Sequence, residues 1–335
     1  MEEGFRLWAN PSSPHAEGRK ARALLEDARE RIKSALDWTH GELIFTSGAS
    51  EAAALALGRA RGERRMVSAV EHDSIVQAAP GAVVLPVGPD GMVDPDELVR
   101  AMRGQGGPVV AVQAINSETG AGQNLTEVCD VVNSAGGISI VDAAQSAGKQ
   151  PATFGSSMVI VSGHKFGGPV GIGALLVTDW ALLEPVGGHE RGYRRGTENL
   201  PGALGMAAAL EAGGEHYMLH DVEDIVAQFA IEVRAVGGTW FADRFARHSH
   251  AINAIAMPAL SAKAQVMRFD LAGIAVSQGS ACSSGTMKPS RVLEALGVPR
   301  EEAERTIRVS LGWNTTRAEV QRFCEVWLEM ARARS

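Results

Sequence analysis

Short apolar segments alternate with polar or helical segments along the first two thirds of the chain. Six apolar segments have the length of strands: ELIFTSGAS, RMVSAVEHDS, GAVVLPVG, PVVAVQAIN, GISIVDAAQS and MVIVSGHK. Strands that alternate with helices predict a mainly parallel sheet with helices on both faces, an α/β fold. Ligands of such sheets bind at the carboxyl ends of the strands. Side chains at these ends are therefore the first candidates for a site.

The helical segments predict two domains. A long amphipathic helix is expected from about residue 15 to 38, with Ser12-Ser13-Pro14 as its cap, and EAAALALGRA predicts another. Residues 201–238 have a helical character and are followed by irregular sequence, the strand TIRVSLG and a last helix from Thr315-Thr316. We expect a large domain over residues 10–210 and a smaller α+β domain over residues 211–335.

Charge and cysteine content narrow the class of protein. The 335 residues carry a net charge of −7, so the chain has no basic footprint for nucleic acid. The amino terminus, MEEGFRLWAN, is acidic, and no apolar run approaches the length of a membrane span. Three cysteines, Cys129, Cys282 and Cys324, form no disulfide framework. We therefore expect a cytoplasmic protein that binds neither nucleic acid nor membrane.

Polar side chains follow five of the predicted strands. They are Thr46 to Ser50, Glu71 to Asp73, Asn116 to Gly120, Asp142 with Gln145, and Ser162 with His164 and Lys165. Each alone has an ordinary reading, such as a helix cap or a structural histidine. Together they place a phosphate cradle, a flat imidazole, a carboxylate and an amine at one edge of the sheet. This set suits pyridoxal 5'-phosphate, which needs a lysine, a carboxylate at its ring nitrogen and a phosphate anchor.

The motifs resemble those of one family. NPSSPHAEGR, FTSGASEA, EHDS, NSETG, VDAAQSAGK, SGHKFGGPVGIGAL, GGHERGYRRGTENLPG, DLAGIAVSQGSACSSG and TIRVSLGWNTT occur in order between residues 10 and 316. They resemble the class V aminotransferase-fold cysteine desulfurases that serve iron–sulfur cluster and nitrogenase assembly. The resemblance implies a pyridoxal 5'-phosphate-dependent enzyme of fold type I that converts L-cysteine to L-alanine.

The resemblance implies a role for each matching residue. Lys165 matches the lysine that binds the cofactor covalently, and His72 matches the imidazole that stacks on its ring and is an acid–base candidate. Arg308 matches the arginine that holds the substrate carboxylate. Thr197 matches a residue that reaches the cofactor phosphate of a second subunit, so a homodimer is implied. The other implied cofactor contacts are Ala49, Ser50, Ser162 and His164 at the phosphate, Asp142 at the ring nitrogen, and Gln145, Asn116 and Ser117 at the ring hydroxyl.

Cys282 distinguishes this subfamily from other users of the fold. It lies in GSACSSG, where the small neighbours offer no apolar packing, whereas Cys129 and Cys324 have the helical spacing of buried structural cysteines. A thiolate at Cys282 could attack the sulfur of the substrate and form an enzyme persulfide. The resemblance implies transfer of this sulfur to a scaffold or carrier protein, with an iron–sulfur cluster at the acceptor interface as an option.

The chain departs from the family in several places, and other functions stay open. No Leu-Asp-x-x-Ala-Thr-Thr segment precedes the first helix. We expect the upstream DNA to encode it in frame unless the form is truncated. Ser117 replaces a frequent asparagine, and residues 213–255 look abbreviated. The alternatives are a selenocysteine lyase, another class V transaminase or lyase, and an impaired homologue. His216 and His220 have the spacing of a metal pair, but we expect solvated residues and no metal.

Overall fold

The chain forms two compact units. The computed structural model describes residues 1–335 except 105, 151–154, 214–216, 218–220, 280–289 and 334–335. The first unit comprises Met1–Leu85, Val93–Ala114 and Asn124–Glu215, and the second comprises Pro86–Met92, Ile115–Gln123 and His216–Ser335. The predicted boundary at residues 210 and 211 lies near the last of these divisions. The two short excursions, residues 86–92 and 115–123, were not predicted.

A seven-stranded sheet forms the centre of the first unit. Its order is β1-β7-β6-β5-β4-β2-β3, and β7 runs antiparallel to both of its neighbours while the other pairs are parallel. The strands are β1 (Glu42–Thr46), β2 (Arg64–Ser68), β3 (Val83–Leu85), β4 (Pro108–Gln113), β5 (Ile138–Asp142), β6 (Met158–Ser162) and β7 (Gly173–Val177). The predicted α/β class with a mainly parallel sheet is confirmed. Strand β7 was not predicted.

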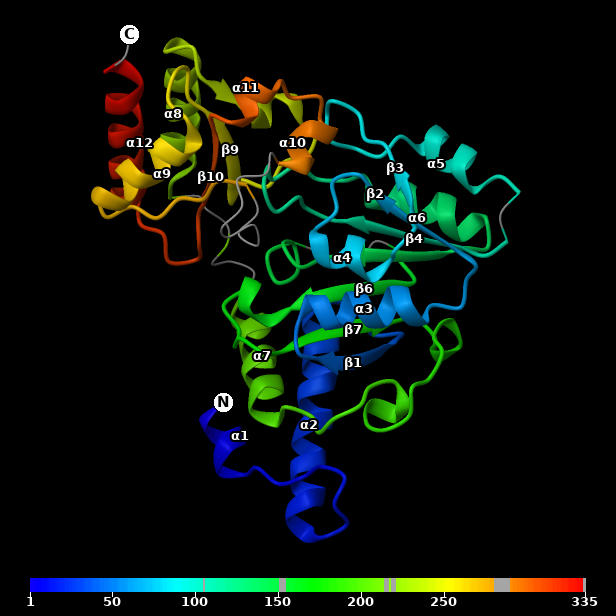
Figure 1. Cartoon of the computed structure of the whole chain (residues 1–335). Helices are drawn as coiled ribbons and strands as arrows, with labels where there is room; N and C mark the ends of the chain where they lie inside the picture. The colour runs from blue at the N-terminus through cyan, green and yellow to red at the C-terminus, as the bar shows by residue number, and fades with distance from the viewer. Residues whose placement is uncertain (105, 151–154, 214–216, 218–220, 280–289, 334–335) are drawn as a thin grey trace. The chain divides into compact units, whose positions relative to one another are not determined.

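Helices pack on the sheet in the first unit (Figure 1). They are α1 (Glu2–Arg6), α2 (Ala16–Ala35), α3 (Ala49–Arg59), α4 (Asp73–Ala78), α5 (Pro95–Met102), α6 (Leu125–Ser134) and α7 (Leu200–Gly213). Helix α3 contacts β1, β6 and β7, α6 contacts β4 and β5, and α2 lies along α7. The predicted cap of α2 is wrong: His15 caps this helix, because its Nδ1 accepts a hydrogen bond from the Gly18 amide at 3.1 Å.

The second unit is an α+β structure. Its antiparallel sheet has the order β10-β9-β8, with β8 (Thr239–Trp240), β9 (Ile252–Ala256) and β10 (Thr306–Ser310). Its helices are α8 (Glu223–Ala235), α9 (Ala262–Leu271), α10 (Arg291–Ala295), α11 (Arg300–Ala303) and α12 (Arg317–Arg332). In its core, Phe229 packs edge to face against Phe323 and against Trp327, with ring centroids 5.5 Å apart in each of these two pairs.

The sequence predicted parts of this unit correctly. The strand at residue 306 is present, and Thr316 begins the last helix with a capping box to Glu319. The segment 201–238, predicted as helical, contains parts of two helices, because α7 ends at Gly213 and α8 begins at Glu223. The segment predicted as irregular contains β8, β9 and α9.

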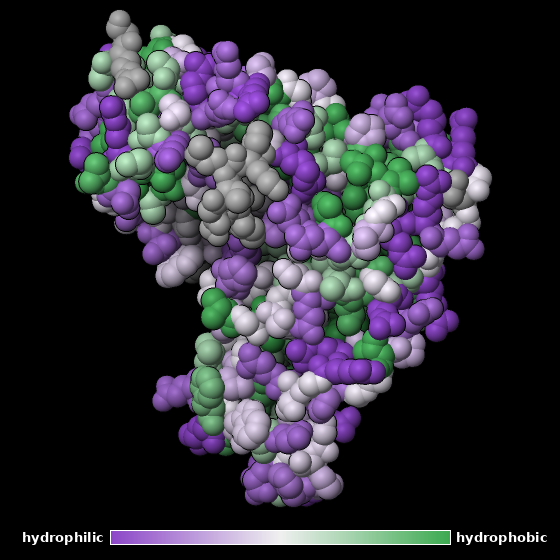
Figure 2. Space-filling model, viewed as in Figure 1, coloured by the Kyte–Doolittle hydropathy of each residue, from purple (hydrophilic) through white to green (hydrophobic). Residues whose placement is uncertain are grey.

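The visible surface is mostly polar. Figure 2 shows hydrophilic residues over most of the face in view, with scattered hydrophobic ones. Among the described residues, none of the helices combines the length and apolar composition that crossing a bilayer requires.

Within the first unit, a buried ion pair fixes the loop before α7 to helix α2. The guanidinium of Arg29 forms two hydrogen bonds to the Glu190 carboxylate, at 2.8 and 3.0 Å, and both side chains are at least 96% buried. Glu190 also accepts a hydrogen bond from the Phe45 amide at 2.8 Å. Glu190 and Arg191 have left-handed backbones, with φ of 48° and 55°. The pair therefore holds a strained turn against α2 and β1.

We expect Arg29→Met to lower the free energy of unfolding by about 3–5 kcal/mol, because it leaves the Glu190 carboxylate buried without its cation. Urea denaturation at pH 7 measures this loss. Glu211→Gln is the matched control, because it breaks the exposed Arg31–Glu211 pair of 2.6 Å, for which about 0–1 kcal/mol is expected. Equal losses in the two variants would contradict the role assigned to the buried pair.

Candidate active site

Asp142 is a buried carboxylate at the carboxyl end of β5. Its side chain accepts a hydrogen bond from the Ala144 amide at 2.9 Å, and only 7% of the residue is exposed. Burial raises the pKa of Asp142, although the Ala144 amide and the electrostatic effects of His72 and Lys165 oppose this shift. The structure thus brings together three residues that the sequence predicted for one site. Such a carboxylate can hold a cationic group of a ligand.

His72 lies in the turn between β2 and α4. Its Nδ1 accepts a hydrogen bond from the Ser74 amide at 3.1 Å and caps α4. This bond leaves Nε2 to carry the ring proton of a neutral imidazole. The residue is half-buried, so part of it is accessible to solvent.

Glu71 supports this turn, a role that we did not predict for it from the sequence. It is fully buried, and its Oε1 accepts hydrogen bonds from Ser68 Oγ at 2.5 Å and from the Gln113 amide at 2.8 Å. These bonds connect the turn after β2 to the adjacent end of β4. The signal was available, because a glutamate that directly follows an apolar strand needs a partner when it is buried.

Lys165 follows β6 in the 3₁₀ turn η1 (Gly163–Lys165). The turn is closed by the Gly168 amide, which donates to the Gly163 carbonyl at 2.9 Å. Ser162 Oγ lies 3.1 Å from His164 Nδ1 at the start of the same turn. Burial and the charge of Lys165 lower the pKa of His164. Lys165 itself is exposed, so its amine is accessible.

Lys149 is a second amine near Lys165 that the sequence reading did not identify. Burial lowers the pKa of Lys149 to about 8, and the charge of Lys165 adds to the shift. At neutral pH a larger fraction of Lys149 is uncharged than for an ordinary lysine. Lys149 is therefore the amine against which any assignment of covalent chemistry to Lys165 must be tested.

The amino end of α3 is the place where the sequence predicts an anion cradle. Ala49 and Ser50 are the first helical residues, and the first N–H groups of a helix have no intrahelical acceptor. Gly48 precedes them with φ of +152°, a conformation that side chains disfavour. A Cβ at Gly173 would lie 2.6 Å from the Gly48 Cα, so β7 can approach the cradle only with glycine there. Ser162, at the end of β6, lies beside Gly48.

Glu51 ties the loop that carries Thr197 to this cradle. Its carboxylate accepts hydrogen bonds from the Ser47 amide at 2.5 Å and from Arg194 Nε at 2.9 Å. Burial opposes its ionisation, but these two partners outweigh burial and lower the pKa of Glu51. Thr197 itself is exposed, and Gln145 is half-buried in the turn after Asp142. Their predicted contacts with a cofactor stay predictions.

Asn116, Ser117 and Arg308 lie together in the second unit. Arg308 Nη1 donates a hydrogen bond to the Ser117 carbonyl at 3.0 Å. Asn116 Oδ1 accepts hydrogen bonds from the backbone amides of Glu118 and Thr119, each at 2.9 Å, and so shapes the turn. The sequence placed Asn116 and Ser117 with the strand-end residues of the large domain, whereas the structure assigns both to the second unit.

The three cysteines fall into two groups. Cys129 and Cys324 are free and buried, as predicted, and burial raises their pKa values to about 11 and about 12. Cys282 lies outside the described residues, as do His216 and His220. Ser277, five residues before Cys282 in the sequence, exchanges two backbone hydrogen bonds with Arg308, at 2.7 and 3.1 Å. The described residues contain no cluster of three or more side chains placed to hold a metal ion.

Comparison with known proteins gives consistent matches over nearly the whole chain. Residues 2–323 match the family model described as aminotransferase class-V. Cysteine desulfurase IscS 1 of Archaeoglobus fulgidus is 33% identical, with 97% of this chain and 90% of the relative covered. A cysteine desulfurase of Cereibacter sphaeroides is 35% identical, with 95% and 87% covered.

Solved structures agree with this comparison. A NifS-like protein from Rickettsia africae has a TM-score of 0.87 and 28% identity, with 98% of this chain and 93% of that chain covered. SspA in complex with cysteine has a TM-score of 0.77 and 28% identity, with 93% of each chain covered.

Proposed function

The chain belongs to the class V aminotransferase family and, within it, to the cysteine desulfurases, and on this premise we propose that it uses pyridoxal 5'-phosphate to remove sulfur from L-cysteine. One structural observation supports the proposal most: the buried carboxylate of Asp142 lies near His72 and Lys165, both of which act to lower its pKa against the effect of burial. A buried carboxylate with a perturbed pKa and such neighbours is typical of a functional site and unusual at an ordinary strand end.

The described residues fit this cofactor. Asp142 would hold the protonated ring nitrogen, since burial leaves its carboxylate in need of a cation. The amino end of α3 at Ala49 and Ser50, with Ser162 and His164 beside it, would hold the phosphate. His72 would lie against the ring, with Gln145, Asn116 and Ser117 at its hydroxyl. When bound, the cofactor supplies an electron sink for bond cleavage at the substrate.

Arg308 would bind the substrate carboxylate. Its backbone is fixed by two hydrogen bonds to Ser277, and its Nη1 is held by the Ser117 carbonyl. The planar guanidinium can still offer N–H groups to a carboxylate in a bidentate pair. The structural neighbour SspA is described as a complex with cysteine, a substrate of the size that this proposal requires.

Cys282 would take the sulfur. Its thiolate would attack the sulfur of the bound cysteine and form a sulfur–sulfur bond, the carbon–sulfur bond would break with its electron pair left on the substrate, and a proton would complete alanine. The products are L-alanine and a Cys282 persulfide, which together contain all atoms of the cysteine and the thiol. Lys165 or His72 would move the proton.

Sulfur would then pass from the persulfide to an acceptor. We propose a scaffold or carrier protein for iron–sulfur cluster or other sulfur-containing cofactor assembly. The site would be completed in a cytoplasmic homodimer, in which Thr197 reaches the phosphate of the second subunit. The bond from Arg194 to Glu51 supports this arrangement, because it fixes the loop that presents Thr197.

We expect borohydride to reduce a covalent bond between the cofactor and Lys165. Peptide mass spectrometry of the reduced protein should find the label on Lys165 and not on Lys149. Lys165→Ala should abolish the label, and the control Lys149→Met should retain it. A labelled Lys149 in the parent protein would show that the amine of lowered pKa, and not Lys165, carries the cofactor.

Replacement of Arg308 should weaken cysteine binding with the cofactor absorbance retained. Loss of a charge-assisted pair costs about 1.5–3 kcal/mol, so Arg308→Ala should raise KM about 10- to 100-fold. Arg308→Lys keeps the charge without the planar guanidinium, so its KM should lie between that of the parent and that of Arg308→Ala. Steady-state alanine production measures both. An unchanged KM in Arg308→Ala would place the carboxylate clamp elsewhere.

Replacement of Cys282 should separate the competing functions. Cys282→Ser should bind the cofactor and cysteine but lose alanine and sulfide production together, because a serine hydroxyl is a far weaker nucleophile than a thiolate. Cys324→Ala is the control and should keep both products. Mass spectrometry should find the persulfide on Cys282 in the parent. Undiminished alanine from cysteine would refute the mechanism, and selenide release from selenocysteine alone would favour a selenocysteine lyase.

A further inference from the structure

The turn that holds Arg308 is itself held by a loop of the second unit. Residues 115–123 lie against residues 245–252: the Gly122 amide donates to the Arg247 carbonyl at 2.9 Å, and the Ser249 amide donates to the Gly120 carbonyl at 2.9 Å. Ala121 and His248 form an antiparallel bridge between them. The turn therefore depends on a segment more than a hundred residues later in the sequence.

The closest approach in this contact is between Gly120 and His248. A Cβ at Gly120 would lie 2.7 Å from His248 Nε2 and 2.1 Å from the Ile252 carbonyl oxygen. Gly120 also has φ of +78°, which side chains disfavour. The imidazole therefore occupies the space that any side chain at position 120 would need. His248 stacks on Phe245 on its other side, with ring centroids 6.2 Å apart.

The turn transmits this contact to Arg308 over a short distance. Asn116 Oδ1 accepts hydrogen bonds from the Thr119 amide at 2.9 Å and from Thr119 Oγ1 at 3.0 Å. Ser117, within the same turn, offers its carbonyl to Arg308 at 3.0 Å. A shift of Gly120 away from His248 would thus move the carbonyl that orients the guanidinium.

We propose that His248 is a positioning residue for Arg308: its imidazole, packed on Gly120, holds the turn whose Ser117 carbonyl orients the substrate-binding guanidinium. The inference rests on the proposed role of Arg308. His248 does not touch substrate and carries no proton in the reaction. Its pKa is lowered to about 4 by burial and by His250, so the ring is neutral at the pH of the assays.

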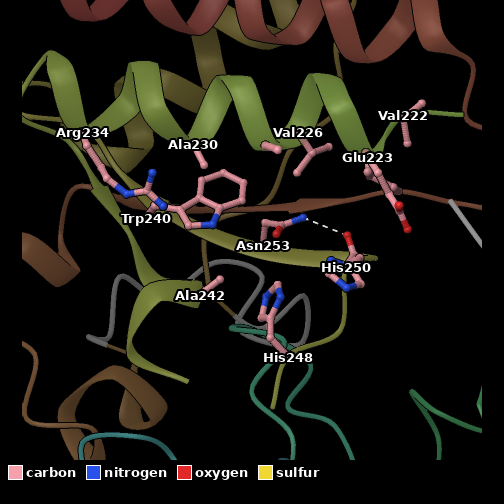
Figure 3. Close-up of a pocket in the computed structure, with 12 residues that line it drawn as sticks. Val222, Glu223, Val226, Ala230, Arg234, Trp240, Ala242, His248, His250 and Asn253 are labelled. Atoms are coloured by element: carbon pink, nitrogen blue, oxygen red, sulfur yellow. Dashed lines mark hydrogen bonds between the residues drawn. The ribbon is translucent and has the colours of Figure 1, made fainter. Parts of the chain in front are cut away.

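His248 also lines a pocket of about 500 Å³ in the second unit (Figure 3). The labelled side chains of Trp240, Asn253 and His250 lie around it. Removal of the imidazole would therefore enlarge a space that already opens to solvent. A small molecule of the same shape can enter such a space, which allows a direct chemical test.

We expect His248→Ala to raise KM for cysteine about tenfold, with kcat within twofold of the parent and cofactor absorbance retained, because the loss of one oriented hydrogen bond costs about that factor. His250→Ala is the matched control, since this exposed histidine lines the same pocket and packs edge to face on His248, with ring centroids 6.1 Å apart, but is not among the nearest neighbours of Gly120. Its KM should change far less than that of His248→Ala. Added imidazole should lower KM in His248→Ala and leave the parent unchanged.

A merely structural role gives a different result. His248→Ala would then lose thermal stability and active fraction with KM unchanged, and this outcome would overturn the proposal. Hydrogen exchange of residues 116–122 supplies a readout that does not need activity: faster exchange in His248→Ala than in His250→Ala is expected, and equal exchange would overturn the proposal. A parent that makes no alanine from cysteine would refute the proposed function alone, and the exchange comparison would still decide whether His248 holds the turn.

Discussion

A carboxylate at the buried end of a strand must have positive charge near it, and this constraint organises the first unit around Asp142. Strand β5 lies between β4 and β6 and is buried along its whole length. The carboxyl ends of these parallel strands meet at one edge of the sheet, where the turns after β2 and β6 bring His72 and Lys165 close enough to affect the pKa of Asp142. The residues around the site then secure these turns: Glu71 fixes the first to β4, and glycines close the second.

Two hydrogen-bonded carboxylates fix the loop between β7 and α7 in a comparable way. Glu190 is bound by Arg29 and by the Phe45 amide, and Glu51 binds Arg194 and the Ser47 amide. The Arg29–Glu190 pair is buried, and the backbone of Glu190 and Arg191 is left-handed. The pair must therefore provide enough stability to hold this strained backbone. The second is partly exposed and acts at the start of α3. The loop is thus fixed at Glu190 and at Arg194 before it reaches Thr197.

The sequence predicted the sheet and the polar residues at its edge because both follow from local patterns. Apolar runs such as MVIV mark buried parallel strands, and the polar residue after each run marks a strand end. Strand β7 was missed because it directly follows a glycine-rich turn, and the turn itself does not signal that a strand begins after it. Glu71 was named at a strand end but was given no role, and Lys149 was not identified, because the sequence does not directly show the burial that makes them chemically unusual. The second unit was predicted least well, since the two excursions at residues 86–92 and 115–123 and the split between α7 and α8 depend on tertiary contacts that no local pattern records.

The environments of Cys129 and Cys324 bear on which thiol can act as the nucleophile. A thiol with a pKa of about 11 or 12 is a thiolate in only about one molecule in 10⁴ or 10⁵ at pH 7. Cys129 and Cys324 are also buried on helices α6 and α12, away from solvent and from any substrate that must enter from it. The chain contains three cysteines. A desulfurase needs an accessible thiolate to take the sulfur, so the burial of Cys129 and Cys324 supports the proposal that Cys282 has this task.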